Sequence, residues 1–401
     1  MDPRIYPEPK AVSEIQGNKA YLKTLRVALV HDWLTGMRGG EKCLEVFCEI
    51  FPQADIYTLF HFPGTVSPTI ERHPIHTTWV QHLPFLAAKY RNYLPLFPLA
   101  LEGLSFQGYD LVLSSSHCVA KAARAPSPAK HISYVFTPIR YVWDMYDIYF
   151  GRESNAGRLP KLLMPLIAPL LRKWDVRTCR RVDHFLADSD HVRKRIRRYY
   201  QREAEVIPVP VDTGQFSLAA GPRDYYLMVT ALAPYKRVDL AVRAFNRLGI
   251  PLIIVGKGPM RERLQGESKK NITWFGWADS DQLKRLYGEC RALIFPGEED
   301  AGITPLEAQA SGRPVVAYGV GGALETIVPL IELQTGRSDF FSGVFFDHQT
   351  EEALVDAVRV LEENLHLIQP EKLQAFARTF DREVFKQRMI ETITSKMKTG
   401  A

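Results

Sequence analysis

The sequence predicts an α/β protein with two doubly wound, Rossmann-like domains that face each other across a cleft. Three observations support this fold class. The chain has 401 residues, which is long for a single hydrophobic core. Buried-type apolar strands alternate with helical patterns in both halves. Several of these strands run into a helix through a glycine-containing turn, an arrangement that suits phosphate binding.

The composition is that of a soluble globular protein, with 46% apolar and 24% charged residues. The five cysteines are scattered and form no C-x-x-C pair, which favours a reducing cytoplasm over a disulfide framework or zinc site. The N-terminus lacks the layout of a signal peptide. The longest uncharged apolar run, residues 162–171, is shorter than the roughly 18 residues that a spanning helix needs. We therefore expect no membrane crossing.

The first half begins with an extension, residues 1–24, that we expect to lie outside the fold. The first domain then covers residues 25–210 and opens with a buried strand at 25–31. Gly39 and Gly40 follow and precede a helix with apolar spacing. This glycine pair indicates either a tight turn or a ligand contact, and it does not match a dinucleotide-binding fingerprint.

Two further strands, 109–116 and 131–138, end in polar turns. In an open parallel sheet, side chains just beyond the strand ends line the site. This places four residues near the cleft: His117, Thr137, Arg140 and Tyr141. A strand at 181–189 then leads into a basic helix, and the proline-rich segment 208–212 suits a domain boundary.

The second domain, residues 211–380, repeats the alternation. Its predicted strands are 224–232, 251–259, 271–277, 291–296 and 314–322, and its predicted helices are 238–249, 279–290 and 351–368. The last segment, residues 381–401, reads as a helix that packs back on the first domain.

The segment 298–314, EEDAGITPLEAQASGRP, organises the second domain. Glu299 and Glu307 lie eight positions apart, on either side of Gly302 and a helix start at Thr304. The turn and helix N-terminus favour an anion, and the carboxylates suit hydroxyl groups. Alternatively, Thr304 and Glu307 form a capping box with no ligand.

Two motifs mislead. The pattern D-x-D, here at 188–190 and 279–281, binds metal in some sugar-nucleotide enzymes, but each copy precedes a helix and is explained by N-capping.

The net charge of +6 is local, because residues 172–202 carry eleven Lys/Arg and four Asp. No recognition motif supports nucleic-acid binding there. Leucine, aromatic and basic residues in 83–104 and 159–174 suggest instead that the first domain docks on an anionic membrane, although most of these residues can be core.

Taken together, the motifs resemble those of the retaining glycosyltransferases of the GT-B fold, family 4, over residues 25–390. The resemblance rests on seven motifs in the expected order besides Glu299-x7-Glu307: HDWLTGMRGGEK, TPIRYVWD, PVPVDTGQF, ALAPYKRVDLAVRAF, VGKGP, WFGW and GGALE. Within the family, the chain is most similar to bacterial mannosyltransferases that build O-antigen and exopolysaccharide.

The resemblance implies roles for individual residues. Glu299 would hold donor-sugar hydroxyls, Glu307 the ribose, and Lys236 the diphosphate. Other donor contacts would come from Gly302, Ile303, Thr304, Gly39 and Gly40, and the base would border Gly256, Gly258, Phe275 and Trp277.

The implied reaction is a front-face transfer that retains the anomeric configuration, in which the departing phosphate takes the proton of the acceptor. The resemblance implies no cofactor and no metal, because Lys236 and helix N-termini supply the positive charge. Two positions depart from the family pattern. Ala231 stands where many relatives have Arg, so Arg237 is the candidate replacement. Phe136 stands where relatives commonly have His, which His117 could replace.

The expected function is transfer of a hexose, best mannose from GDP-mannose, onto a lipid-linked oligosaccharide. The expected partners are the nucleotide sugar, this acceptor and an anionic membrane, with no nucleic acid. The expected location is the cytoplasm, peripheral at the inner face of the membrane. GDP-rhamnose, UDP-sugar or dTDP-sugar donors remain alternatives, as does a catalytically silent sugar-nucleotide-binding subunit.

Overall fold

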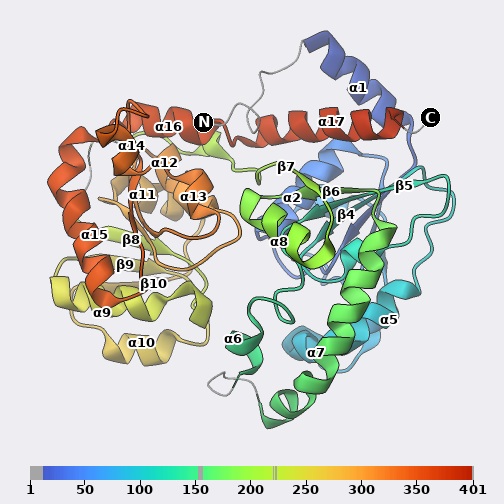
Figure 1. Cartoon of the computed structure of the whole chain (residues 1–401), viewed down its shortest axis with the longest axis horizontal. Coiled ribbons are helices and arrows are strands. Elements are labelled where there is room, and N and C mark those ends of the chain that lie inside the picture. The colour runs from blue at the N-terminus through green and yellow to red at the C-terminus, as the bar shows by residue number, and fades with distance from the viewer. Residues whose placement is uncertain (1–11, 152–156, 220, 222–223, 400–401) are drawn as a thin grey trace. The chain divides into compact units, whose positions relative to one another are not determined.

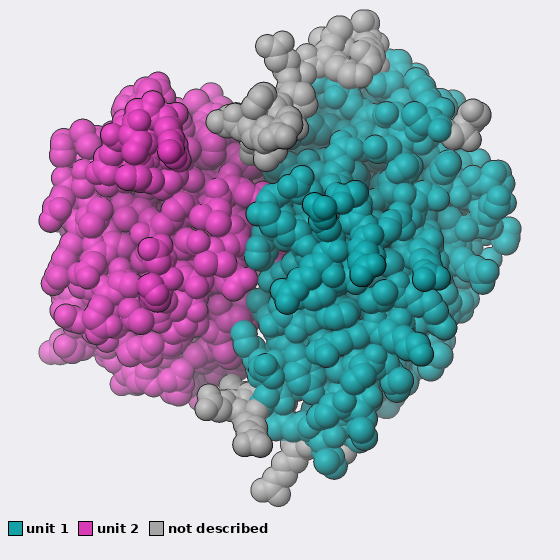
Figure 2. All heavy atoms as spheres, viewed as in Figure 1, with its two compact units in different colours: residues 1–210, 383–401 teal, residues 211–382 magenta. Residues whose placement is uncertain are grey.

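The computed structural model describes residues 12–151, 157–219, 221 and 224–399. The chain forms two compact units, which Figure 2 distinguishes by colour. Unit 1 comprises residues 1–210 and 383–401, and unit 2 comprises residues 211–382. Each unit contains its own parallel sheet with helices around it, so the prediction of two Rossmann-like α/β domains is confirmed.

Unit 1 is built on a seven-stranded parallel sheet of order β3-β2-β1-β4-β5-β6-β7. The strands are β1 (Val27–His31), β2 (Asp55–Thr58), β3 (Ile75–Thr77), β4 (Leu111–Ser116), β5 (Lys130–Val135), β6 (His184–Ala187) and β7 (Ala204–Val206). The central strands β1 and β4 are buried along their whole length, which is why their sequences are nearly continuous apolar or small-residue runs.

The helices of unit 1 surround this sheet (Figure 1). They are α1 (Val12–Thr24), α2 (Gly39–Ile50), α3 (Pro68–Glu71), α4 (Leu86–Lys89), α5 (Phe97–Glu102), α6 (Tyr146–Phe150), α7 (Arg158–Thr178), α8 (Asp190–Tyr200) and α17 (Arg382–Lys398). Short 3-10 turns include η2 (Tyr90–Leu96) and η3 (Ala120–Ala122). The last helix belongs to unit 1, where the Phe385 ring of α17 stacks on Phe47 of α2 at 5.9 Å.

The N-terminal segment departs from the expectation that residues 1–24 lie outside the fold. Residues 12–24 form α1, in which the Leu22 side chain is fully buried. Gln53 Nε2 donates to the carbonyl oxygens of Leu22 and Leu25 at 3.0 and 3.1 Å. The expectation failed because proline and charge in the first residues masked an apolar anchor at the end of the helix. Residues 1–11 lie outside the described residues.

Unit 2 is built on a six-stranded parallel sheet of order β10-β9-β8-β11-β12-β13. The strands are β8 (Tyr226–Val229), β9 (Leu252–Val255), β10 (Ile272–Gly276), β11 (Leu293–Phe295), β12 (Val315–Tyr318) and β13 (Gly343–Phe346). The helices are α9 (Val238–Leu248), α10 (Arg261–Glu267), α11 (Ser280–Glu289), α12 (Ile303–Ala310), α13 (Ala323–Thr326), α14 (Leu330–Gln334), α15 (Glu351–Asn364) and α16 (Pro370–Arg378), with the 3-10 turn η6 (Pro234–Lys236).

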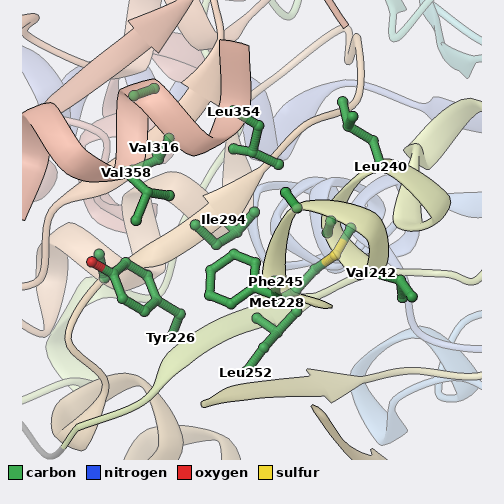
Figure 3. Close-up of a cluster of buried hydrophobic side chains, with 14 of the residues drawn as sticks. Tyr226, Met228, Leu240, Val242, Phe245, Leu252, Ile294, Val316, Leu354 and Val358 are labelled. Atoms are coloured by element: carbon green, nitrogen blue, oxygen red, sulfur yellow. The ribbon is translucent and has the colours of Figure 1, made fainter. Parts of the chain in front are cut away.

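The core of unit 2 lies between the sheet and the helices α9 and α15 (Figure 3). Met228 and Ile294 project from adjacent strands toward Phe245 of α9 and Val358 of α15. The hydrophobic effect of burying these side chains holds the two helices on the sheet. The strand ends, which carry the candidate site, are therefore fixed by a packed layer beneath them.

Elements in segments for which no element is predicted above include β2, β3, β13 and α16. The three strands have only three or four residues each, and a run that short carries little periodicity. β3 and β13 also lie at sheet edges, where one side of the strand is unpaired.

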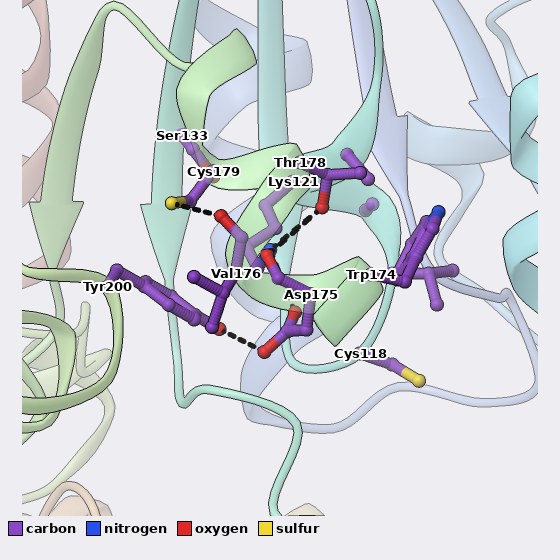
Figure 4. Close-up of polar contacts among 12 residues, drawn as sticks. Cys118, Lys121, Ser133, Trp174, Asp175, Val176, Thr178, Cys179 and Tyr200 are labelled. Carbon is purple, nitrogen blue, oxygen red and sulfur yellow. Dashed lines mark hydrogen bonds and ion pairs between the residues drawn. The ribbon is translucent and has the colours of Figure 1, made fainter. Parts of the chain in front are cut away.

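A buried ion pair ties together three helical elements of unit 1 (Figure 4). The Lys121 ammonium of η3 lies 2.8 Å from Asp175 Oδ1 of α7 in an ion pair and donates to the Asp175 carbonyl oxygen at 2.8 Å, and both side chains are fully buried. The Tyr200 hydroxyl of α8 and the Trp143 indole N–H both donate to Asp175 Oδ2 at 2.9 Å. Lys121 Nζ also lies 4.6 Å from the centre of the Tyr200 ring. This cluster fixes the C-terminal end of α7 against the sheet.

We predict that Lys121→Met lowers the free energy of unfolding of unit 1 by about 3–5 kcal/mol, because it leaves the Asp175 carboxylate buried without its cation. Urea unfolding followed by circular dichroism measures this loss. The matched control is Lys284→Met in unit 2, whose ion pair with Asp281 at 3.1 Å is largely exposed. The control should change stability by less than about 1 kcal/mol. Equal effects of the two variants would contradict the prediction.

Candidate functional site

Each sheet has one place where the strand order reverses. In unit 1 it lies between β1 and β4, and in unit 2 between β8 and β11. Connections leaving two such strands turn to opposite faces of the sheet, so the carboxyl ends of the strands open a crevice in which ligands bind. The residues that follow these four strands are therefore the candidate site residues of each unit.

In unit 2, the switch point brings together the two residues that the sequence places at the centre of the chemistry. Lys236 lies in η6 after β8, and Glu299 follows β11. The Lys236 ammonium donates to Glu299 Oε1 in an ion pair, and each side chain is 16% exposed. Lysine and carboxylate thus form a charged pair that still reaches solvent, so a polar ligand can exchange with either partner.

Glycines allow the close approach that builds this pair. A Cβ on Gly297 would lie 3.0 Å from the Tyr235 carbonyl oxygen and 3.1 Å from Lys236 Cα. On the other side, Gly321 pairs with the backbone of Glu299 in an isolated parallel bridge, and Gly322 N donates to Glu299 O at 2.8 Å. The backbone of Glu299 is therefore held between two turns in which an added side chain would crowd the neighbouring backbone.

The helix that follows does not begin as a capping box. α12 starts at Ile303 with Gly302 as its N-cap and no side-chain cap hydrogen bond, so Thr304 lies inside the first turn. A side chain on Gly302 would overlap Thr326 Oγ1, which explains the glycine. The capping-box alternative for Glu307 is therefore wrong. The helix N-terminus, with the backbone N–H groups of Ile303 and Thr304, instead lies directly after the Glu299 turn.

Glu307 has a side-chain partner that sequence reasoning missed. The Tyr287 hydroxyl of α11 donates to Glu307 Oε2 at 2.7 Å. Burial, together with the nearby Glu307 carboxylate, holds the pKa of Tyr287 far above its ordinary value, so this hydroxyl stays a donor. Tyr287 therefore orients Glu307. No motif spacing links the two residues, because they come from different helices.

Arg237 is expected to bind the diphosphate, but in the structure its side chain contacts other protein groups. Its backbone is left-handed at φ 53, and its guanidinium donates to Gln349 Oε1 at 2.7 Å and contacts Asp239. Gln349 in turn donates to the Pro296 carbonyl oxygen at 2.8 Å. In this structure, Arg237 braces the turn after β11, and its use as a diphosphate cation stays a prediction.

The glycines expected to border the base lie together at the ends of β9 and β10. Gly256 N donates to Gly276 O at 2.7 Å. A side chain on Gly256 or Gly258 would overlap the Thr230 or Leu232 carbonyl, because the loop after β8 packs directly against them. Two aromatic residues flank this turn on its outer side, Phe275, 38% exposed, and Trp277, 72% exposed.

Unit 1 has a buried polar cluster at its own switch point. Asp32, directly after β1, accepts four backbone N–H groups of residues 117–120 at 2.6–2.9 Å. His117, directly after β4, places Nδ1 3.2 Å from Asp32 Oδ2 and packs its ring edge-on against Trp33 at 4.4 Å. Burial and the charges of Arg140 and Arg38 lower the pKa of His117. His117 is thus a neutral imidazole held by the β1 turn.

His31, the last residue of β1, was not singled out from the sequence. Its Nδ1 lies 2.7 Å from Ser115 Oγ, and its buried Nε2 has no hydrogen-bond partner among the described residues. A Cβ on Gly40 would lie 3.4 Å from the His31 ring, so Nε2 lies beside the start of α2. Burial lowers the pKa of His31 to about 3, so it is neutral near pH 7. Because His31 ends an apolar strand, its sequence context is that of a buried core residue.

The remaining cleft residues of unit 1 have mainly structural contacts. Thr137 is buried and accepts from Arg195 Nη1 at 3.4 Å, and Tyr141 packs edge-on against Tyr149 at 5.0 Å. Phe136 lies 6.5 Å from both the His31 and the His117 ring centres. Two histidines therefore surround the position at which relatives commonly carry one.

Glu41 is a further buried carboxyl that the sequence did not reveal. It lies in the first turn of α2, directly after Gly39 and Gly40, and is 4% exposed. The backbone N–H of Arg38 donates to Glu41 Oε2 at 3.1 Å. Burial raises the pKa of Glu41 to about 7, against the opposing charge of Arg38. This carboxyl can therefore gain or lose a proton near neutral pH.

The two D-x-D sequences are helix caps, as expected. Ser189 accepts from Val192 N at 3.1 Å at the start of α8. Asp279 accepts from Gln282 N at 2.8 Å at the start of α11 and receives the reciprocal bond of a capping box. Among the residues that the structure describes, no group of three or more His, Cys, Asp or Glu side chains is placed to hold a metal ion.

Two families match adjoining parts of the chain. Residues 38–215 match "Glycosyltransferase Family 4", and residues 214–380 match "Glycosyl transferases group 1". The chain belongs to the GT-B glycosyltransferases of this group. The two matches divide at residues 214–215, close to the boundary between units 1 and 2.

Among curated relatives, the chain is 25% identical to the O-antigen chain mannosyltransferase C of Escherichia coli, over 54% of this chain and 58% of the relative. It is 28% identical to the O-antigen chain mannosyltransferase RfbU of Salmonella typhimurium, over 37% of this chain and 45% of the relative. The alignments therefore span about half the length of these relatives.

Among solved structures, the chain resembles a sucrose-phosphate synthase from Thermosynechococcus elongatus with a TM-score of 0.70 at 15% identity, covering 94% of this chain and all of that one. It also resembles Anabaena Alr3699/HepE in complex with UDP, with a TM-score of 0.67 at 14% identity, covering 92% of this chain and all of that one. These likenesses establish the GT-B fold of the chain.

The environment of Glu41 predicts a pH dependence of stability. Its pKa is raised in the folded state, so the stability it contributes is present below its unfolded pKa of 4.5 and is lost as pH rises toward 7. Between these values the contribution falls by about 3 kcal/mol. We predict that Glu41→Gln matches the wild type near pH 4.5 and is more stable at pH 8.

Urea unfolding of both proteins at the two pH values measures this difference. The control is Glu45→Gln, which makes the same substitution elsewhere on the same helix. Parallel pH profiles for the wild type and Glu41→Gln would contradict the assigned environment of Glu41.

Proposed function

We propose that this protein is a retaining glycosyltransferase that moves mannose from GDP-mannose onto a lipid-linked oligosaccharide, in the synthesis of a bacterial surface polysaccharide. The observation that carries the proposal is the Lys236–Glu299 pair at the β8/β11 switch point, immediately before the N-terminus of α12. A cation, a carboxylate and a helix N-terminus together match the charges and hydroxyl groups of a sugar diphosphate.

Each group has a distinct role in the proposal. Lys236 moves from Glu299 to the diphosphate when donor binds, and Glu299 then accepts hydrogen bonds from sugar hydroxyls. The N–H groups of Ile303 and Thr304 face the phosphate oxygens. Glu307, oriented by Tyr287 at 2.7 Å, accepts from the ribose hydroxyls. The positive groups concentrate where negative charge develops on the leaving phosphate, which is the most effective place for them.

In the proposed reaction, the acceptor hydroxyl oxygen attacks the anomeric carbon from the face that the diphosphate leaves. The bond from that carbon to the phosphate oxygen breaks, and the departing phosphate oxygen takes the hydroxyl proton. The nucleoside diphosphate leaves, and the configuration is retained. No protein base and no metal or other cofactor is required in this scheme, since the leaving group itself accepts the proton and Lys236 offsets its charge.

The donor assignment is supported by relatives whose names specify mannose. Besides the two O-antigen mannosyltransferases, a Mycobacterium tuberculosis relative is named a GDP-mannose-dependent mannosyltransferase and is 29% identical over 31% of this chain. GDP-rhamnose, UDP-sugar and dTDP-sugar donors are the competing candidates. We place the reaction at the cytoplasmic face of the cell membrane.

A second candidate function is a catalytically silent subunit that binds a sugar nucleotide. The observation that favours it is the loss of two expected groups at Ala231 and Phe136, together with the engagement of Arg237 by Gln349 and Asp239. Slow release of nucleotide from a sugar nucleotide in the absence of acceptor supports the enzyme. Tight binding without release supports the silent subunit.

We predict that GDP and GDP-mannose raise the melting temperature of unit 2, because a ligand that binds only the folded state stabilises it by mass action. At one hundred times the dissociation constant, the gain is about 2.7 kcal/mol. A thermal-shift series with GDP, UDP, dTDP and ADP measures the preference for the base. A shift with UDP alone would contradict the mannose donor.

Replacing Glu299 or Glu307 should affect two different quantities, the rate of transfer and the affinity for GDP. Glu299→Gln should reduce donor hydrolysis and transfer at least a hundredfold, roughly the loss of one transition-state contact. It should leave the affinity for GDP within a few fold, because this residue is assigned to the sugar. Glu307→Gln should instead weaken GDP roughly tenfold, as expected for one charge-assisted hydrogen bond.

Calorimetric titration with GDP and an assay of released nucleotide measure the two quantities. The matched control is Glu332→Gln in α14, whose carboxylate pairs with Arg337 and lies outside the proposed site. Unchanged transfer by Glu299→Gln would contradict its role.

A further inference from the structure

Helix α7 has an apolar side turned to solvent. Leu162, Leu166 and Leu170 recur every four residues, and their exposed fractions are 70, 72 and 68%. At this spacing they form one stripe along the helix. Lys173 and Arg177 are also exposed and extend the stripe toward the C-terminal end. We name these five residues the α7 face.

The opposite side of the same helix is conventional core. Met164, Ala168 and Leu171 are buried in the hydrophobic cluster of unit 1. The C-terminal end is fixed by Asp175 in the buried cluster with Lys121. The helix is therefore apolar on both sides, although only one side packs against other residues that the structure describes. Single exposed leucines are ordinary, but a row of three on a firmly anchored helix indicates a binding surface.

A second exposed apolar group adjoins α7. α7 contacts η2, which lies between α4 and α5 and contacts both. Phe85, just before α4, is 76% exposed, and Leu99 of α5 is 66% exposed. The Phe85 backbone is left-handed at φ 53, an uncommon and costly conformation for a bulky residue. Lys89 lies 5.6 Å from the centre of its ring. We name Phe85, Lys89 and Leu99 the α4 patch.

The charge around these residues is mainly positive, with Glu102 of α5, which pairs with Arg181 and accepts from Trp174 of α7, as an acidic neighbour. Residues 72–101 and 157–174 contain no Asp or Glu, whereas a chain with 45 acidic residues in 401 would carry about five in that length. In the basic helix α8, Arg193 and Lys194 pair with Asp190, and Arg195 pairs with Asp144. The positive charge beside exposed leucine is thus concentrated on α7 and α4.

We infer that the α7 face and the α4 patch bind the surface of an anionic lipid bilayer. Leucine and phenylalanine enter the boundary between headgroups and acyl chains, while the long Lys and Arg side chains remain at the phosphate level. Each basic residue near an anionic surface strengthens binding by roughly fivefold. Within the described residues no helix combines the length and the apolar character that a bilayer crossing requires. The interaction is a docking of one side of unit 1.

Flotation of the full chain with vesicles tests this inference. The chain should float with vesicles of phosphatidylcholine mixed with phosphatidylglycerol, and much less with phosphatidylcholine alone. Binding should weaken near 1 M salt, where charges are screened beyond about 3 Å. Leu166→Ser/Leu170→Ser should reduce the bound fraction at least tenfold, and Lys173→Glu/Arg177→Glu should remove the preference for anionic lipid.

Matched controls lie on the exposed surface of unit 2. Ile331 and Leu367 are 56 and 38% exposed, so Ile331→Ser/Leu367→Ser removes two exposed apolar side chains elsewhere and should leave flotation unchanged. Lys270→Glu/Arg285→Glu makes the same change of charge elsewhere and should keep the anionic preference. Circular dichroism melting of every variant verifies that the fold is retained.

Three results would overturn the inference. They are the absence of flotation with anionic vesicles, equal flotation of Leu166→Ser/Leu170→Ser and the wild type, and a dimer that this variant converts to monomer while the wild type binds no vesicle. The third would assign the α7 face to a second copy of the chain. None of these measurements depends on sugar transfer, so the inference can fail while the proposed function holds, and the reverse.

Discussion

The close approach of three turns in unit 2 is the constraint on which the candidate site depends. The turns after β8, β11 and β12 meet at Gly297, Gly321 and Gly322, where added side chains would contact or overlap neighbouring backbone. This packing places Lys236 against Glu299 and brings α12 directly behind them. The switch point of the parallel sheet determines where the crevice lies. The three glycines allow the backbone turns to approach closely there.

Unit 1 has a related arrangement, in which two neutral histidines lie beside a buried aspartate. Asp32 gathers four backbone N–H groups and holds His117, while His31 points its second nitrogen toward the start of α2. The same short segment, residues 117–122, continues to Lys121, whose ammonium binds Asp175 of α7. The histidines and the exposed leucine face of α7 therefore belong to one rigid framework. A bilayer that orients α7 would thereby orient this end of unit 1 as well.

The parts of the fold that could be predicted from the sequence are those in which local pattern and burial agree. The apolar strands β1 and β4 and the amphipathic helix α9 lie within the predicted segments, and β5 begins one residue before its predicted segment. Glu299 was singled out because it lies in a glycine turn before a helix, and Lys236 because its motif resembles that of the family. Their ion pair could not be read from the sequence, since it depends on the meeting of two connections sixty-three residues apart.

The failures have equally specific causes. The local sequence permits a capping box at Thr304. In the structure, Gly302 packs closely against Thr326 and the helix begins at Ile303. The Glu307 carboxylate accepts a hydrogen bond from Tyr287 instead. His31 and Glu41 were overlooked because polar residues in an apolar strand or a first helical turn have ordinary structural uses. Only the structure distinguishes these two residues from ordinary ones. His31 Nε2 is buried without a hydrogen-bond partner among the described residues, and Glu41 is buried beside the charge of Arg38.

The most direct test of the central claim is amide hydrogen exchange of the full chain with and without GDP-mannose. The account places the diphosphate at the carboxyl ends of β8 and β11, so the ligand should slow exchange in residues 299–306 and 256–258. Exchange in the buried strand β13 should stay unchanged, since it lies far from the switch point in the order of the sheet. Protection confined to other segments, with residues 299–306 unaffected at saturating ligand, would contradict the account.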